Sequence, residues 1–294
     1  MGLKKSDKKD LVLGLYNNKD NKYSKRSLVK TIGISESCLY YESTLNSKDL
    51  IVKQEIEEQY KVDDTLGAKK LSKLIAHSTG KIARIMLKFN IFPRPVTPQY
   101  RYGGKSDNVV ENLLLSRKDI TNYEVIFSDI FEFKLLNQQK VYGCFMLRKS
   151  TRQILSFSYG NNMEATLVKG SLRHMFFSKD LSQAKIIFHS DQGKQFGAEI
   201  TVEQLLEYKF ERSMSRAGTP TDNGYAERFV GIFKHSVVNR YRYENLSQFA
   251  EFSYKWLNFY NNLRPHSSLE NKSPNNYAIE KGIEPVRVLV PNLL

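Results

Sequence analysis

Alternating apolar and polar positions predict strands in the middle of the chain. In Glu124–Leu135 the odd positions form an apolar face that is interrupted once, by Asp129. The five strands expected on this basis cover 123–136, 141–149, 152–160, 185–189 and 209–214. Helical patterns follow at 164–178, at 200–208 and around Glu227. Three consecutive strands followed by alternating helices and strands predict an α/β core, in which helices flank a mixed five-stranded sheet.

The residues before this core have helical patterns. Helices expected at Lys8–Tyr16, Lys25–Thr31 and Glu36–Tyr41, with a Gly33-containing turn before the third, are typical of a helix-turn-helix. An ordinary helical hairpin is the alternative. Three further helices are expected at 50–60, 68–77 and 79–90. After the core, a helix at 247–262 carries an aromatic stripe that we expect to pack onto the core.

The charge of the chain indicates the kind of partner that it binds. The chain of 294 residues has 45 Lys and Arg against 31 Asp and Glu, a net charge of +14, which favours a polyanionic partner. Between residues 61 and 105, ten Lys and Arg face only two Asp, which is the electrostatic footprint of a DNA-binding module. No apolar run approaches the length of a membrane-spanning helix. Two distant cysteines and an N-terminus without a signal peptide predict a reduced, cytoplasmic protein.

Three acids are candidates for a shared site. A buried carboxylate such as Asp129 is costly unless it is paired or binds a cation, although a shifted register that leaves it solvated is an alternative. Asp191 follows a short apolar strand, and Glu227 lies on a later helix. Sixty-one residues separate Asp129 from Asp191, and thirty-five separate Asp191 from Glu227.

This spacing resembles the D, D-35-E pattern of integrases and transposases. The segments HSDQGKQFG, SMSRAGTPTDNGYAERF and YNNLRPHSSLENKSPNNYA resemble those of orfB-type transposases of insertion-sequence family three. The resemblance implies a ribonuclease-H-like core and a bacterial, cytoplasmic, nucleoid-associated protein. The expected domains are a helix-turn-helix-like domain at 1–48, a second basic helical DNA-binding domain at 49–92, a linker at 93–119, an integrase catalytic core at 120–240 and a helical extension at 241–294.

The resemblance also implies a chemistry. Asp129, Asp191 and Glu227 would be catalytic and would hold two Mg²⁺ ions, which Mn²⁺ can replace, for cleavage and strand transfer at insertion-sequence ends. The partners would be double-stranded DNA, as transposon ends and target, and further copies of the chain, as a dimer or higher oligomer. The expected DNA contacts are Lys69, Lys70, Lys73, Lys81, Arg84, Lys88, Asn223, Lys234, Arg264 and His266.

The chain departs from the family at four positions. Gln192 stands where Arg is common, Gly224 where Ala is usual, Arg228 where Ser follows the Glu, and Phe131 where Thr is common near the first Asp. None of these removes an expected metal ligand. Two alternatives to a transposase are a nuclease of the same fold that only hydrolyses, and a DNA-binding regulator with a silent core.

Overall fold

The computed structural model describes residues 5–18, 21–40, 45–95, 106–175 and 179–288. These form two compact units, Met1–Val52 and Lys53–Leu294. Most of the expected linker, including Arg101 and Lys105, lies outside the described residues. Among the described helices, none combines the length and apolar character needed to cross a bilayer.

The first unit is small and helical. It contains α1 (Lys5–Tyr16), α2 (Lys25–Ile32), α3 (Glu36–Tyr40) and the start of α4 (Leu45–Val62). Gly33 ends α2 with φ of 72°, a left-handed conformation that glycine adopts without strain, and the chain turns there into α3. Val12, Val29 and Leu39 form its buried core. The helices and the turn lie where the sequence predicts them, and their assignment as a helix-turn-helix stays a prediction.

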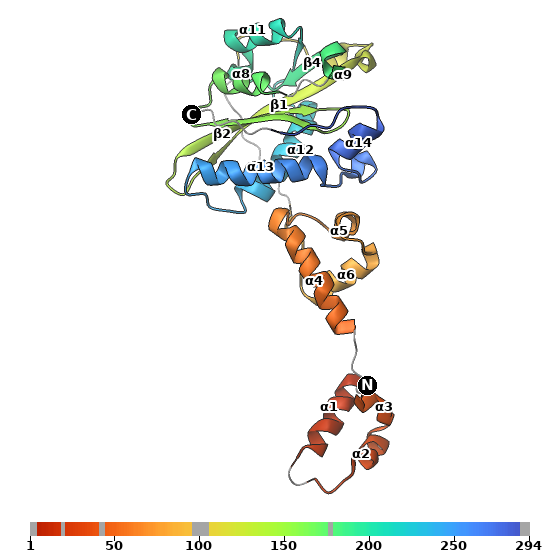
Figure 1. Cartoon of the computed structure of the whole chain (residues 1–294). Helices are drawn as coiled ribbons and strands as arrows, with labels where there is room; N and C mark the ends of the chain where they lie inside the picture. The colour runs from red at the N-terminus through yellow and green to blue at the C-terminus, as the bar shows by residue number, and fades with distance from the viewer. Residues whose placement is uncertain (1–4, 19–20, 41–44, 96–105, 176–178, 289–294) are drawn as a thin grey trace. The chain divides into compact units, whose positions relative to one another are not determined.

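A five-stranded mixed sheet organises the second unit (Figure 1). Its strands are β1 (Tyr123–Lys134), β2 (Lys140–Arg148), β3 (Ile154–Gly160), β4 (Lys185–Ser190) and β5 (Glu211–Met214). Their order is β3-β2-β1-β4-β5: β2 is antiparallel to both neighbours, whereas β4 is parallel to β1 and to β5. The predicted mixed sheet, and the ribonuclease-H-like fold that the resemblance implied, are confirmed.

Helices cover both faces of the sheet. In Figure 1 α8 and α11 lie on one side of the strands, and α12 and α13 lie on the other. The helices and helical turns of this unit are the rest of α4, α5 (Ala68–Leu74), α6 (Thr79–Lys88), α7 (Leu113–Ser116), η1 (Ile120–Asn122), α8 (Ala165–Arg173), α9 (Lys179–Gln183), α10 (Lys194–Gly197), α11 (Glu199–Glu207), η2 (Pro220–Asn223), α12 (Gly224–Phe233), the π-helical η3 (Lys234–Val238), α13 (Leu246–Asn262), η4 (Ser267–Leu269) and α14 (Pro274–Glu280).

The core of the second unit is rich in aromatic rings. On the α12 side of the sheet, Phe145 lies 4.5 Å from Phe229, and Phe157 lies 5.0 Å from Phe233, between ring centroids. Trp256 of α13 is fully buried, 5.4 Å from Phe233. The predicted packing of the aromatic stripe of α13 onto the core is therefore confirmed. Packing continues without a break past residue 240, so the finer division into domains stays a prediction.

Candidate active site

Asp129 lies on β1, and Asp191 directly follows the last residue of the neighbouring parallel strand β4. Phe127 of β1 pairs with His189 of β4, and two further residues along each strand lead to Asp129 and Asp191. Paired residues of parallel strands direct their side chains to the same face. The rings of Phe127 and His189 confirm this, because their centroids are 5.3 Å apart on that face. The two carboxylates therefore emerge side by side where β4 ends.

Helix α12 brings Glu227 across the same face. Its Tyr225 stacks on Phe127 at 4.9 Å, and its Phe229 contacts Phe145, the residue that pairs with Asp129 on β2. Just before the helix, the Asn223 amide donates a hydrogen bond to the Ser128 carbonyl at 3.3 Å. These contacts on either side of Glu227 hold it over β1 at the level of Asp129.

The three acids influence one another. Burial, followed by the negative charge of Asp191, raises the pKa of Asp129 to about 8, and Glu227 adds to the effect. Lys234 and a hydrogen bond from the Ile130 amide oppose it. Burial also raises the pKa of Asp191 and of Glu227. The charges of Asp191 and Glu227 therefore act on Asp129, whereas the shared role of the three acids stays a prediction.

Backbone amides orient two of these carboxylates. Asp129 Oδ1 accepts from Ile130 N at 2.7 Å, and Asp191 Oδ1 accepts from Gly193 N at 2.9 Å. Among the described residues, no three His, Cys, Asp or Glu side chains are gathered closely enough to hold a metal ion. The donor set is still of the right kind for Mg²⁺, since all three groups offer hard carboxylate oxygens. The type of these side chains and their negative charge therefore suit Mg²⁺, whereas the three side chains do not lie close enough together to bind one ion.

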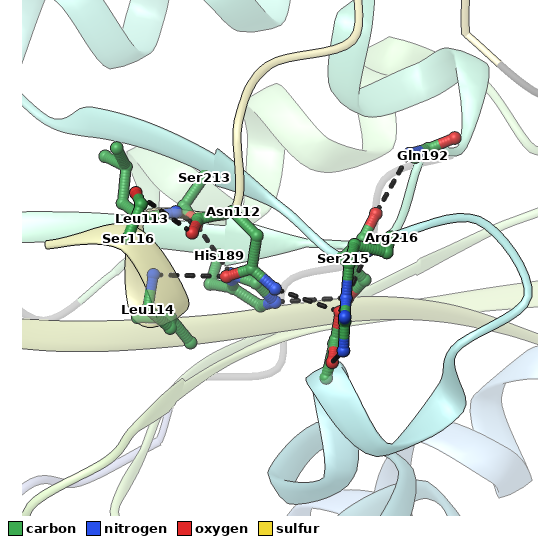
Figure 2. A network of polar contacts seen from close by, with 10 residues as sticks. Asn112, Leu113, Leu114, Ser116, His189, Gln192, Ser213, Ser215 and Arg216 are labelled. Carbon is green, nitrogen blue, oxygen red and sulfur yellow. Dashed lines mark hydrogen bonds and ion pairs between the residues drawn. The ribbon is translucent and has the colours of Figure 1, made fainter.

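A hydrogen-bonded network supports the end of β4. Figure 2 shows His189 between two hydroxyls: Nδ1 is 2.8 Å from Ser213 Oγ, and Nε2 is 3.1 Å from Ser215 Oγ. Burial lowers the pKa of His189 to about 4, so the ring is neutral at pH 7. The Gln192 side chain donates to the Ser215 carbonyl at 3.0 Å. Hydrogen bonds from His189 and Gln192, on either side of Asp191, therefore hold this end of β4 against β5 and the residue that follows β5.

Comparison with known proteins bears on this arrangement. Two family models described as integrase core domain match residues 121–220 and 208–274. The transposase for insertion sequence element IS904 of Lactococcus lactis is 30% identical over 43% of this chain and 50% of its own length. The putative transposase InsK for insertion sequence element IS150 of Escherichia coli is 24% identical over 87% of this chain and 93% of its own length. This chain belongs to the integrase-core family of insertion-sequence transposases.

A third relative, a transposase-like protein of Haemophilus influenzae, is 28% identical over 72% of this chain and 97% of its own length. This chain thus spans half of the length of the IS904 transposase and nearly all of the length of the other two relatives. The matched regions contain Asp129, Asp191 and Glu227. The roles of these three residues remain proposals.

The expected DNA contacts on α5 and α6 face solvent to different degrees. Exposed side chains are Lys69, Lys73, Arg84 and Lys88, and half-buried ones are Lys70 and Lys81. Lys81 Nζ lies 3.4 Å from His77 Nδ1. On α12 and its continuation, Asn223 is buried, with its amide oxygen lacking a partner among the described residues, and Lys234 lies over the Phe131 ring at 5.7 Å.

Arg264 and His266 have a different setting from the one expected. The Arg264 guanidinium is buried, and its Nε donates to Asp63 Oδ2 at 2.7 Å. His266 Nε2 is buried without a partner among the described residues. Burial, then the charge of Arg264, lowers the pKa of His266 well below its ordinary value. Arg264 therefore has a structural partner, and any contact with DNA phosphate would come in addition to that ion pair.

The sequence did not single out Asp63, Ser213 or Ser215. Asp63 was counted only as one of two acids in a basic stretch, which gives no sign that it is buried against Arg264. The hydroxyls of Ser213 and Ser215 alternate with Met214 at a strand end, a polar pattern that could have marked them as partners of His189. The departure at Phe131 also has an explanation: its ring lies over Gly143, where a Cβ atom would meet it at 2.5 Å.

Proposed function

We propose that this chain is a DNA transposase whose Asp129, Asp191 and Glu227 hold Mg²⁺ for strand cleavage and strand transfer at insertion-sequence ends. The observation that supports the proposal is the placement of three acids around one end of the sheet, with Asp129 on β1, Asp191 directly after β4 and Glu227 on α12, where Asp191 and Glu227 both raise the pKa of Asp129. Membership of the family supports the same reaction class.

Electrostatics explain why this site needs a cation. The DNA phosphodiester is an anion, and three uncompensated carboxylates would repel it. When bound, Mg²⁺ supplies positive charge that stabilises the attacking and leaving oxygens of an in-line displacement. Without a cation, burial and the neighbouring acids raise the pKa of Asp129 to about 8, so that its protonation relieves part of this repulsion at neutral pH.

The chain's own residues position the carboxylates. The Ile130 and Gly193 amides orient Asp129 and Asp191, and Asn223 fixes the start of α12 to β1. The Lys234 ammonium lies near the acids, where it offsets part of their charge, and it is well placed to meet a phosphate. The exposed cations of α5 and α6 would hold flanking DNA, and we propose that two or more copies act together because a transposon has two ends.

The test is strand joining by the full chain. Labelled insertion-sequence ends, a target plasmid and Mg²⁺ should give joined products with the wild type, and Mn²⁺ should replace Mg²⁺. Asp129→Asn, Asp191→Asn and Glu227→Gln should each reduce joining by orders of magnitude while end binding persists. As a matched control, Glu203→Gln neutralises an exposed acid of α11 and should join strands normally.

Joining by all three variants at wild-type rates would refute the catalytic assignment. The two alternatives are separated by the products. A nuclease would release cut ends without joining them, and a regulator would bind ends without changing them in any metal.

A further inference from the structure

A cavity of about 420 Å³ adjoins a side of α12 that does not carry Glu227. Gly224, Tyr225, Arg228 and Ile232 line it from one side of that helix, whereas Glu227 lies on a different side. Its other walls come from the β2–β3 turn, from the segment after α13 and from α5. The cations that line it are Lys70, Lys149, Arg152, Arg228 and Arg264.

Positive charge in this cavity is poorly balanced. Asp222 is the acid among the lining residues, and Arg216 already engages its carboxylate at 2.9 and 3.0 Å. Arg264 is paired with Asp63. Within the described part of the chain, no carboxylate lies within ion-pair distance of the four remaining cations, which are Lys70, Lys149, Arg152 and Arg228.

Burial and neighbouring cations disfavour the charged form of Lys70. Burial, followed by the charges of Arg264 and Arg228, lowers the pKa of Lys70 to about 8, although Asp63 opposes this. Arg152 contributes from a strained position, since its φ of 59° is left-handed backbone that glycine or asparagine adopts more readily. Its guanidinium lies 4.2 Å from the centre of the Tyr225 ring and donates to the Lys149 carbonyl. An anion bound in the cavity would neutralise part of this positive charge.

The lining favours a nucleotide over a simple ion. Aromatic rings of Tyr225, Tyr260 and Phe127 lie among the cations and offer surfaces against which a sugar or base can pack. Arginine guanidinium groups match phosphate oxygens with two parallel hydrogen bonds. A volume of about 420 Å³ lies within the range of small-molecule sites.

The cavity is next to the acids along the same elements. Phe127 lines it and precedes Asp129 by two residues on β1, a separation of about 7 Å along a strand. Arg228 directly follows Glu227 on α12. A strand of DNA that places one linkage at the acids can therefore present a nearby phosphate to the cavity.

We propose that this cavity binds a phosphate of the DNA strand, together with part of its nucleotide, close to the linkage held at the acids. The identity of the strand and the position of its linkage at the acids rest on the proposed function, whereas the binding of a phosphate and part of a nucleotide does not. Arg152 and Arg228 grip the phosphate, Lys70 and Lys149 add charge, and Tyr225 supports the nucleotide.

The experiment compares two pocket variants with a matched control in the full chain. Arg228→Gln and Arg152→Gln each remove one cation of the cavity, and Arg173→Gln removes an exposed cation of α8, on the other face of the sheet. Binding of a short single-stranded oligonucleotide is measured by fluorescence anisotropy over a series of salt concentrations. Inorganic phosphate is tested separately by its effect on the thermal midpoint.

Each pocket variant should bind the oligonucleotide about tenfold more weakly, because a charged hydrogen bond is removed. The slope of log affinity against log salt should decrease by about 0.7, the value for one phosphate of a single strand. Arg173→Gln should match the wild type in both measurements. Phosphate should raise the thermal midpoint of the wild type and of Asp129→Asn more than that of either pocket variant.

Wild-type affinity and slope in both folded pocket variants would overturn the proposal. Pocket-dependent stabilisation by phosphate without any effect on the oligonucleotide would also overturn it, because the ligand would then be a free phosphate compound. If the wild type fails to join strands but the pocket variants still lose oligonucleotide affinity, the proposed function fails and the pocket assignment stands.

Discussion

The ion pair between Asp63 and Arg264 should be a main determinant of stability in the second unit. Its two side chains are 0% and 3% exposed, and Asp63 Oδ2 accepts from Arg264 Nε at 2.7 Å. Asp63 Oδ1 also accepts from Thr65 Oγ1 at 2.6 Å and from Ser236 Oγ at 2.9 Å. The carboxylate therefore connects the end of α4 to η3 and to the segment after α13. Asp63→Asn removes its charge and nearly keeps its shape.

The expected loss is about 3–5 kcal/mol of the free energy of unfolding, the range for breaking one partner of a buried pair. Asn retains an oxygen for Thr65 and Ser236, but its amide would face the Arg264 guanidinium, and two donors cannot satisfy each other. The positive charge of Lys70 would lose the same compensating neighbour. Glu251→Gln is the control, because the Lys255–Glu251 pair has a similar distance of 2.6 Å but both side chains are over 60% exposed. It should cost less than about 0.5 kcal/mol.

Urea unfolding at pH 7 provides the measurement, with the slope against urea used to check that the same surface is exposed. Burial raises the pKa of Asp63, but the charge of Arg264 and hydrogen bonds from Thr65 outweigh it, so the net shift is downward. A lowered folded pKa stabilises the protein above the unfolded value of about 4, and this contribution is lost as pH falls through the folded pKa. The difference between wild type and Asp63→Asn should therefore narrow in acid. A loss no larger than that of Glu251→Gln would refute the reasoning.

Three further outcomes are expected. Asp129→Asn should raise the free energy of unfolding of the metal-free chain at pH 7 by on the order of 3 kcal/mol. The reason is that a folded pKa of about 8 makes the stability of the wild type fall as pH rises from about 4 to 8. Thermal midpoints at pH 5 and pH 8 should therefore differ for the wild type and be nearly equal for the variant. Gly143→Ala should lower the free energy of unfolding by about 1–3 kcal/mol, since the new Cβ would overlap the Phe131 ring, and an unchanged urea midpoint would contradict this. Replacing Lys69 and Lys73 together with Ala should reduce the slope of log affinity for duplex DNA against log salt by about 0.9 for each phosphate that is no longer neutralised. An unchanged slope would mean that these two lysines do not contact DNA.

The sequence alone predicted the sheet and indicated the candidate acids, because both depend on patterns among neighbouring residues. Strand periodicity requires only neighbouring residues, so the interrupted apolar face predicts that Asp129 lies on a strand, and the structure has it on β1. The same reasoning predicted the aromatic stripe of α13. It did not predict α14, because short helices are decided by packing more than by propensity.

Tertiary structure alone decided which charges meet. Arg264 reads as a surface cation in a polar segment, and Asp63 precedes it by about two hundred residues, so no local pattern shows that the pair is buried. The cavity is likewise assembled from α5, the β2–β3 turn, α12 and the segment after α13, and its cations look like ordinary solvated charges along the chain. Burial and charge pairing depend on distances between segments far apart in sequence. Periodicity and candidate acids can therefore be read from the chain itself, whereas the partners of Asp63, Arg264 and His189 had to come from the fold.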